Sequence, residues 1–354
     1  MGRRHNRAIR NFVRPTMPLD SNAVLRRRQA LALSAAAAAS LWMPAAQAQG
    51  ASAQALAYPD RAIRIVVPFA PGAGTDAMAR LVAQKLGEVM NASFVVDNRA
   101  GASGAIGTQF AAQAPADGYT LLLVASPFTT VAASVPSANY DPLRQFTPVG
   151  MIASGPLVWA ANNALPVSSM KELVALARQK PGVLNYGSAG AGGVNHLVLE
   201  LLKARTGIFI THIPYRGIAP ATMDMIGGQI ELVTGTIPAL LPFIKNGSIK
   251  ALAVTSAKRS SALPDVPSMS EAGLAGFDVV NYFALAAPAG TPAAIVSRLN
   301  AAINKVVALP EVLARFKVDA VEAAPGSTEM LGQFIEADYR AWRHVVKTQN
   351  LKID

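Results

Sequence analysis

The chain has 354 residues, of which 51% are hydrophobic and 15% charged, so it can bury one large core or, as we expect, two cores of ordinary domain size. It contains no cysteine, which excludes disulfides, thiolate metal sites and cysteine nucleophiles. The formal net charge is +11, but residues 1–48 hold eight arginines and one acid, which leaves 24 basic and 20 acidic residues elsewhere. A weakly basic body without an aromatic and basic stripe gives no case for nucleic-acid binding.

Residues 1–48 have the pattern of an export signal. Arg26–Arg28 precede an apolar, alanine-rich run at 30–43, and Ala46-Gln47-Ala48 is a small-residue cleavage pattern. Because the run is too short and too weakly hydrophobic for a transmembrane helix, we expect an exported protein whose signal is cleaved after Ala48. The arginine pair fits a twin-arginine or an ordinary secretory signal. Translation can begin at either of two methionines, Met1 or Met17.

The stretch 61–90 predicts a strand, a glycine turn and an amphipathic helix in immediate succession. The β-branched run 63–69 suits a strand that is buried on both faces, and Gly72 and Gly74 follow it. Thr75 or Asp76 is expected to cap the helix. A glycine turn that opens a helix gathers unpaired backbone N–H groups at the positive end of the helix dipole, so this stretch predicts an anion site.

Strands and helices continue to alternate after this unit. Strands are expected at 94–97 and 119–125, with a helix at 106–114 between them, which is typical of a parallel sheet covered by helices on both faces. Pro127 and Pro136 are expected to break the following region. A second α/β series is then predicted, with a capped helix at 169–180, a strand at 184–188, a glycine turn at 187–193, strands at 208–214 and 230–234, and a short helix at 270–275.

The simplest topology for this order has two lobes. The chain is expected to leave the first lobe near Leu157 and to return near Val279, so that two crossovers form a hinge beside a cleft. The predicted fold is α/β, with a mostly parallel sheet flanked by helices in each lobe. Its divisions are an export signal at 1–48, lobe one at 58–156 plus 280–354, and lobe two at 157–279.

A nicotinamide-dependent dehydrogenase is the enzyme alternative. Gly72, Gly74 and Ala77 match a relaxed dinucleotide fingerprint, and Asp97 ends the next strand, where a ribose-binding acid is expected. Against it, Asp76 would place a negative charge beside the pyrophosphate. The turn also lacks the lysine of a nucleoside triphosphate loop.

Signals for other chemistry are weak. His196, His212 and His344 have no metal-ligand spacing, no serine stands in a nucleophile elbow, and no catalytic pair of carboxylates can be identified. We therefore expect no catalytic residue, no metal and no cofactor. His196 either faces the cleft or is a surface or core residue. What remains is a pair of glycine turns with hydroxyls nearby, which suits a small carboxylate; the alternative is that the glycines only permit tight turns.

Several motifs, in order along nearly the whole body, closely resemble the Bug family, the extracytoplasmic solute receptors of tripartite tricarboxylate transporters. These are Pro68–Asp76, Asp97–Gly101, Pro115–Thr120, Leu184–Gly190, His212–Gly217, Leu252–Thr255, Leu263–Pro267 and Ala287–Pro292. The resemblance implies a two-lobed periplasmic binding protein of type II-like fold. It also implies a monomeric receptor that delivers a small organic acid to membrane permease subunits or to a sensor protein.

The same resemblance implies the ligand-binding residues. They are Phe69, Ala70, Gly74, Thr75, Asp76 and Ser126 in lobe one, and Ser188, Ala189, Gly190 and His196 in lobe two. The sequence departs from the family pattern at Ala73, Ala100, Gly193-Val194 and Thr234-Gly235-Thr236. These departures leave open a receptor for a ligand that is not a carboxylate.

Overall fold

The computed structural model describes residues 58–72 and 74–351, so the expected export signal lies outside the described residues. The strands are β1 (Ile63–Val67), β2 (Phe94–Asn98), β3 (Thr120–Ala125), β4 (Phe146–Asn162), β5 (Asn185–Ser188), β6 (Thr211–Pro214), β7 (Leu232–Thr236), β8 (Ile249–Val254), β9 (Val280–Pro288) and β10 (Glu322–Ala323). The helices are α3 (Gly74–Met90), α4 (Ala105–Ala112), α5 (Pro127–Ser134), α6 (Met170–Gln179), α7 (Val194–Thr206), α8 (Ile218–Ile226), α9 (Ile237–Lys245), α10 (Ala293–Val306), α11 (Pro310–Val318) and α12 (Thr328–Thr348). Short 3-10 helices lie at Ala102–Gly104 and Pro136–Ala138.

The first sheet, sheet A, is built on β1. This strand pairs in parallel with β2 and β3, and β3 pairs with β9, which runs antiparallel to it. β9 continues the sheet to β4, and β10 adds a short antiparallel edge. The apolar run of β1 is expected to be covered on both sides, and Ile63, Ile65, Val66 and Val67 are indeed fully buried.

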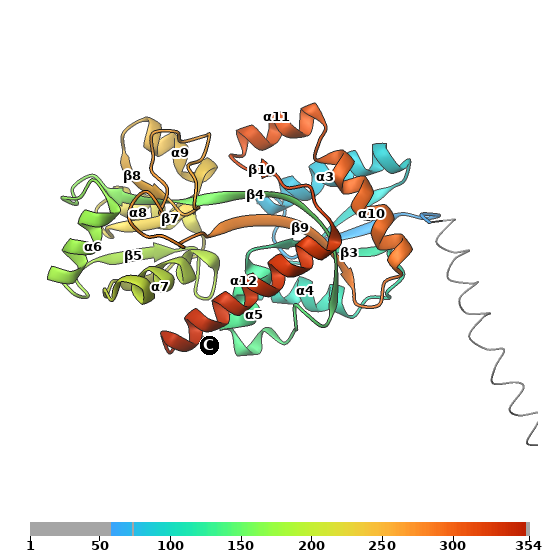
Figure 1. Ribbon diagram of the computed structural model, residues 1–354, viewed down its shortest axis with the longest axis horizontal. Coiled ribbons are helices and arrows are strands. Elements are labelled where there is room, and N and C mark those ends of the chain that lie inside the picture. The colour runs from blue at the N-terminus through green and yellow to red at the C-terminus, as the bar shows by residue number, and fades with distance from the viewer. Residues whose placement is uncertain (1–57, 73, 352–354) are drawn as a thin grey trace, which may run out of the picture. The chain divides into compact units, whose positions relative to one another are not determined.

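The second sheet, sheet B, repeats the pattern on β5. β5 pairs in parallel with β6 and β7, whereas β7 and β8 both run antiparallel to β4. Figure 1 shows β5, β7 and β8 grouped with α6 to α9, and β3 grouped with α3, α4 and α10. Each group therefore has its own strands and its own covering helices.

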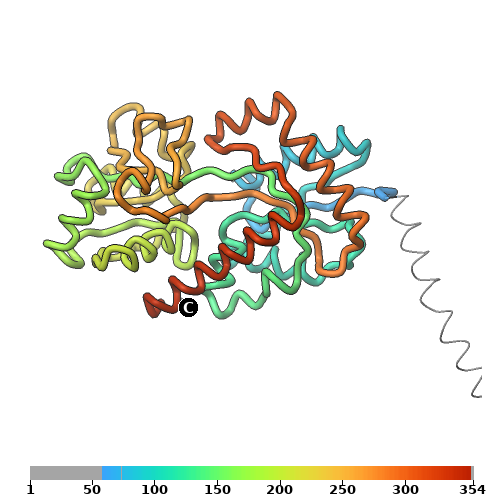
Figure 2. The backbone as a smooth tube through the Cα atoms, viewed as in Figure 1, coloured from blue at the N-terminus to red at the C-terminus, as the bar shows by residue number. Residues whose placement is uncertain are grey.

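Two long strands connect the sheets. β4 pairs with β9 in sheet A as far as Pro156, which lies opposite Val280, and pairs with β7 in sheet B from Leu157 onward. The backbone trace in Figure 2 follows both strands from one group of elements to the other. The change of partner falls where the sequence predicts the chain to leave its first lobe. The division into two lobes that move about these strands stays a prediction.

Helix α12 packs against the cores of both sheets. Leu331 and Ile335 in its first half belong to a buried cluster with residues of β1, β3 and β9. Trp342 and Val345 in its second half belong to a different cluster, with residues such as Trp159 and several leucines of α7. α12 is therefore a third connection between the two groups of elements, formed by side-chain packing rather than by strand pairing.

Asp338 lies in the middle of α12. Its carboxylate accepts hydrogen bonds from Trp342 Nε1 at 2.9 Å and from Thr129 Oγ1 of α5 at 2.6 Å. Loss of water around this partly buried group raises its pKa from 3.8 to about 6. The ionised form is thus the costly one, and the two hydrogen bonds only partly offset that cost.

This pKa predicts a pH dependence of stability. Because the folded state holds its proton to higher pH than the unfolded state, the free energy of unfolding should fall by about 2–3 kcal/mol as pH rises from about 4 to about 6 through this group. Asp338→Asn should remove this part of the dependence and be more stable than wild type at pH 8. Urea unfolding of both proteins across pH 4.5–8 measures the difference, and parallel curves would contradict the prediction.

Local predictions were met in part. Ser169 caps α6 as expected, since the backbone N–H of Glu172 donates to its hydroxyl at 3.2 Å. The expected break at Pro127 is wrong, because α5 begins there and the first position of a helix needs no N–H donor. The expected helix at 270–275 is only a turn, which ends at Gly273 with φ +89°. Helix α11 was not predicted.

Candidate functional site

Asp76 forms hydrogen bonds that fix the first glycine turn, which contains Gly72 and precedes α3. This side chain is 4% exposed, and its carboxylate accepts hydrogen bonds from the backbone N–H of Gly72, from Arg80 Nε and from Asn98 Nδ2, each at 2.9 Å. The bond from Arg80, with those from the other two groups, lowers the pKa of Asp76 to about 2. α3 begins at Gly74, so Asp76 bonds the turn before the helix rather than capping the helix itself.

Asn98 connects this turn to the next strand. Its amide donates both to Asp76 and to the backbone carbonyl of Phe69 at 3.0 Å. Asp97 beside it forms ion pairs with Arg99 at 3.0 Å and Arg64 at 3.6 Å. In the dehydrogenase alternative, Asp97 would bind a ribose, but here its carboxylate is already paired with two arginines.

The remaining predicted residues of this turn differ in exposure. Ala70 and Gly74 are exposed and Thr75 is half-buried. Phe69 lines a small cavity of about 10 Å³ on the other side of the turn, next to Gly104 and Thr108. Gly74 and Thr75 are thus the members of this group that present backbone and hydroxyl at a helix N-terminus.

Ser126 joins the end of β3 to β9. It is 1% exposed; its hydroxyl lies 3.0 Å from Asn281 Oδ1, to which it donates, and accepts from the backbone N–H of Tyr282 at 3.3 Å. Ser126 therefore positions the Asn281 side chain, and a ligand would meet the asparagine before it met the serine.

The second glycine turn is held by internal bonds. The hydroxyl of Ser188, fully buried, accepts from the backbone N–H of Gly190 at 3.1 Å and lies 2.6 Å from His212 Nε2. Burial lowers the pKa of His212 to about 3, so the ring that pairs with the Ser188 hydroxyl through Nε2 is neutral. Ala189 is exposed and Gly190, with φ +138°, is half-buried.

His196 is a buried, paired side chain. It is 6% exposed, stacks on His212 with ring centroids 3.8 Å apart, and accepts the backbone N–H of Gly192 on Nδ1 at 3.1 Å. Its Nε2 lies 3.6 Å from Glu200, which also pairs with Lys203 at 2.9 Å. His196 was expected either to face the cleft or to be a surface or core residue, and the structure shows that it is buried. Its role as a ligand contact stays a prediction.

None of residues 187–193, which form the second glycine turn, lines the cavity at Gly74 that is described below. The second turn instead contacts α5, because Ser134 Oγ donates to the carbonyl of Gly192 at 3.3 Å. This contact places the second turn against the helix that follows Ser126.

A cavity of about 130 Å³ lies where β4 and β9 pass between the sheets. Of the predicted site residues, all of which are described, Gly74 alone lines it. Its lining comes from α3, α9, α11 and the two strands: Gly74, Ala77, Met78, Gly155, Pro156, Thr236, Ile237, Pro238, Asn281, Phe283, Arg315, Asp319, Ala320 and Val321. The start of α3 and the start of α9 therefore meet at one cavity, and both are helix N-termini.

Sequence reasoning missed most of this lining. Thr236 lies in a segment already marked as a departure from the family pattern, so a signal existed there. Asn281, Arg315 and Asp319 stand in no local motif. They reach the cavity only because β9 and α11 return to sheet A after sheet B is complete.

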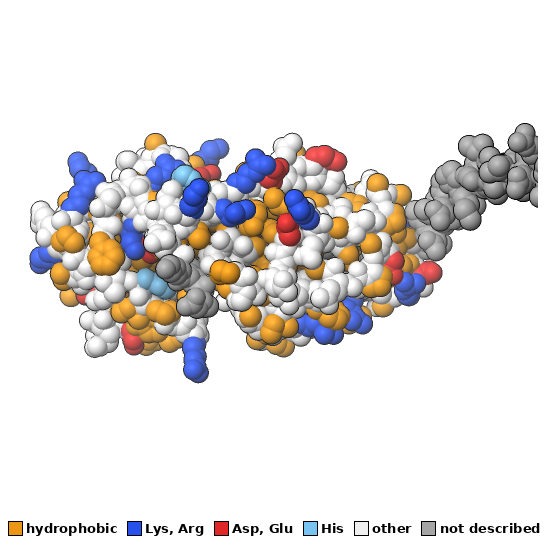
Figure 3. Space-filling view, turned by 90° about the horizontal axis from the view of Figure 1, so that it is seen from below, with side chains coloured by type: hydrophobic (Ala, Val, Ile, Leu, Met, Phe, Trp, Pro, Cys, Tyr) orange, Lys and Arg blue, Asp and Glu red, His pale blue; other side chains and the backbone are white. Residues whose placement is uncertain are grey.

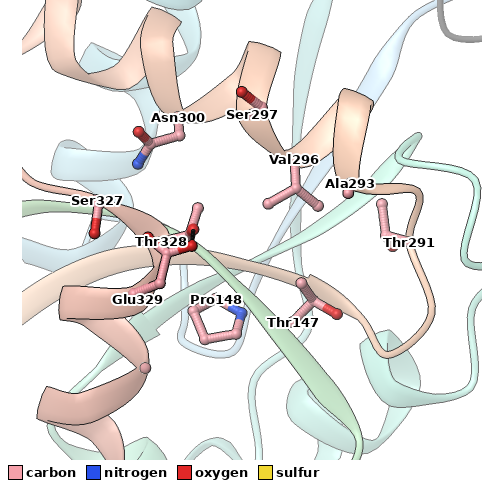
Figure 4. A pocket seen from close by; sticks show the side chains of 11 residues that line it. Thr147, Pro148, Thr291, Ala293, Val296, Ser297, Asn300, Ser327, Thr328 and Glu329 are labelled. Atoms are coloured by element: carbon pink, nitrogen blue, oxygen red, sulfur yellow. Dashed lines mark hydrogen bonds between the residues drawn. The ribbon is translucent and has the colours of Figure 1, made fainter.

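A larger pocket, of about 690 Å³, lies at the starts of α10 and α12 (Figure 4). Several of its polar groups are already paired within the protein. Thr291 donates to the carbonyl of Pro288 at 2.8 Å, Ser327 caps α12, and the Asn300 amide donates to the carbonyls of Val149 and Gly326. Sheet B contributes nothing to its lining, whereas both sheets line the smaller cavity.

Other kinds of site find no support in the part of the chain that the structure describes. Within residues 58–72 and 74–351, no group of three or more His, Asp or Glu side chains is arranged to hold a metal ion. Nor does any helix there combine the length and apolar character needed to cross a membrane. On the face drawn in Figure 3, basic side chains are scattered among acidic ones.

Two α/β sheets joined by two strands, with a cavity at the junction, define a solute-binding protein of the periplasmic class. The model of the tripartite tricarboxylate transporter family receptor, TctC, matches residues 78–351. The chain belongs to this family, as the resemblance implied.

Curated relatives agree. Protein BugT of Bordetella pertussis is 37% identical over 298 residues, which are 84% of this chain and 91% of that protein. The UPF0065 protein in the tcbD-tcbE intergenic region of Pseudomonas sp. strain P51 is 37% identical over 82% of this chain and 87% of its own length.

Solved structures give the same family. The R. palustris protein Rpa4515, solved with adipate, has a TM-score of 0.74 and 37% identity, and the match covers 83% of this chain and 99% of that one. MatC from Rhodopseudomonas palustris, with bound malate, has a TM-score of 0.71 and 29% identity over 82% of this chain and 100% of its own. The periplasmic-binding-protein fold is thus confirmed, and the dehydrogenase alternative has no support among these relatives.

Proposed function

We propose that this protein is a periplasmic receptor that binds a small carboxylate, or another organic anion, between its two sheets and delivers it to a transporter or sensor. The observation that carries the proposal is the cavity at which the N-termini of α3 and α9 meet. Backbone N–H groups at both ends favour a negative charge there, and no acid of α3 faces it because Asp76 is bonded inside the turn.

The proposal assigns the movement to β4 and β9. Lobe one would comprise residues 58–156 and 280–354, and lobe two residues 157–279, so that these two strands form the hinge. Closure would bring the second glycine turn, with Ser188, Ala189 and Gly190, toward the ligand held at Gly74 and Thr75. Ser126 supports the site through Asn281.

The proposal includes the setting of the protein. The receptor would be exported with its signal removed after Ala48, act as a monomer, catalyse no reaction, and pass its ligand to the permease subunits of a tripartite tricarboxylate transporter or to a sensor protein. Membership of the receptor family supports a periplasmic receptor that works with a tripartite transporter.

A titration tests the proposed function. Purified protein without its first 48 residues should bind members of a panel of mono- and dicarboxylates, measured by isothermal calorimetry, and should not bind NAD or NADP. Binding of a nicotinamide nucleotide without binding of any carboxylate would overturn the proposal. Native mass spectrometry of freshly purified protein would detect a co-purified ligand that the panel does not contain.

A further inference from the structure

The lining of the inter-sheet cavity is mostly apolar, with Thr236 and Asn281 as its neutral polar side chains and one ion pair. Met78, Ile237 and Phe283 contribute large apolar side chains, and Arg315 and Asp319 are its charged residues. Its volume of about 130 Å³ is close to that of a protein cavity of about 150 Å³ that binds benzene. The enclosed part of a ligand is therefore apolar and about the size of one six-membered ring or a short methylene chain.

Gly155 brings the ion pair to this cavity. It lies in β4 opposite Asn281, and a Cβ built on it would stand 2.7 Å from the carbonyl oxygen of Ala320. Only glycine lets the segment after α11 pack this closely on the strand. Arg315 in the last turn of α11 and Asp319 directly after the helix are held beside the cavity as a result.

The guanidinium of Arg315 is oriented by a hydrogen bond through Nε, which leaves its two terminal Nη groups for a ligand. Its Nε donates to Asp319 Oδ2 at 2.8 Å, and this bond raises the pKa of Arg315 further. Among the described residues, no hydrogen bond of its two terminal Nη groups to a protein atom is found, and the side chain is 51% exposed. A planar guanidinium fixed through Nε presents its Nη groups to a carboxylate or a similar oxyanion.

We propose that Arg315 determines specificity for organic dianions. Building on the proposed function, one carboxylate lies at the start of α3, the apolar body fills the cavity, and a second carboxylate meets the Nη groups of Arg315. Asp319 orients the arginine and is not a ligand contact. A monocarboxylate with the same body would keep the first two interactions and lose the third.

Matched ligand pairs test this assignment. Hexanedioate is compared with hexanoate, and benzene-1,4-dicarboxylate with benzoate, in calorimetric titrations at pH 7.5. For at least one pair, wild type should bind the dianion about tenfold more tightly or better, since one charge-assisted hydrogen-bonded contact is gained. Arg315→Gln should reduce that ratio to about two or less, because the dianion then loses its contact with the guanidinium.

Lys317→Gln is the control variant. It removes a positive charge from the same exposed helix without touching the cavity, so the ratio should stay as in wild type. Thermal melts show whether each variant folds. Ratios that fall equally in both variants, or that survive Arg315→Gln, would overturn the role of Arg315. Wild type that binds monocarboxylates without preferring dianions would overturn this inference alone, whereas wild type that binds no organic anion would overturn the proposed function as well.

Discussion

Asp76→Ala is expected to abolish carboxylate binding and to lower the free energy of unfolding by about 1–3 kcal/mol, because two part-buried donors lose their acceptor. These donors are the backbone N–H of Gly72 and the amide of Asn98. Arg80 is 56% exposed and can return to water, so its loss adds little. Without the carboxylate the turn before α3 loses its hydrogen bonds to Gly72 and Asn98. Calorimetric titration and urea unfolding measure the two effects.

Thr75→Val is the matched variant for this prediction. It removes a hydroxyl from the neighbouring residue but leaves the bonds of Asp76 in place. Affinity should fall while the free energy of unfolding changes by less than about 1 kcal/mol. If Asp76→Ala binds carboxylates as tightly as wild type, the first glycine turn is not part of the site.

Trp342→Ala is expected to lower the free energy of unfolding by about 3–5 kcal/mol, the usual cost of emptying a large buried aromatic position. Trp342 is 4% exposed and packs α12 into the core of sheet B, although the first half of α12 packs on sheet A. Its loss should therefore also loosen one connection between the sheets. Urea unfolding gives the stability, and small-angle scattering with and without ligand gives the change in dimensions.

Trp342→Phe separates packing from hydrogen bonding. It fills most of the same space but loses the bond from Nε1 to Asp338, so a cost of only about 1–2 kcal/mol is expected. An equal loss in both variants would show that the hydrogen bond, and not the packing of α12 on sheet B, is the important contribution.

Much of the fold was predictable because it depends on local patterns. The buried run of β1, the glycines before α3 and the capping serine of α6 each depend on residues within one or two turns of the chain. α5 was not predicted because Pro127 follows a strand and was interpreted as a break. In sequence, a proline that breaks a structure cannot be distinguished from one at the first position of a helix.

The site was less predictable because its lining comes from distant segments. Two glycine turns were predicted as a pair, yet Ser188 and His196 bond within sheet B, and the start of α9 shares the cavity with Gly74. Which helix N-terminus faces Gly74 depends on the paths of β4 and β9, and no local pattern encodes those paths.

The sequence by itself therefore determined the α/β class, the family and the first glycine turn, since each is written in contiguous residues. Only the tertiary structure decided that Asp76 closes the turn, that His196 is buried against His212, and that Arg315 reaches the cavity. The physical reason is that these contacts join separate segments of the chain, from Asp76 with Asn98 in the next strand to Gly155 against the distant Ala320, and they exist only once the strands have paired.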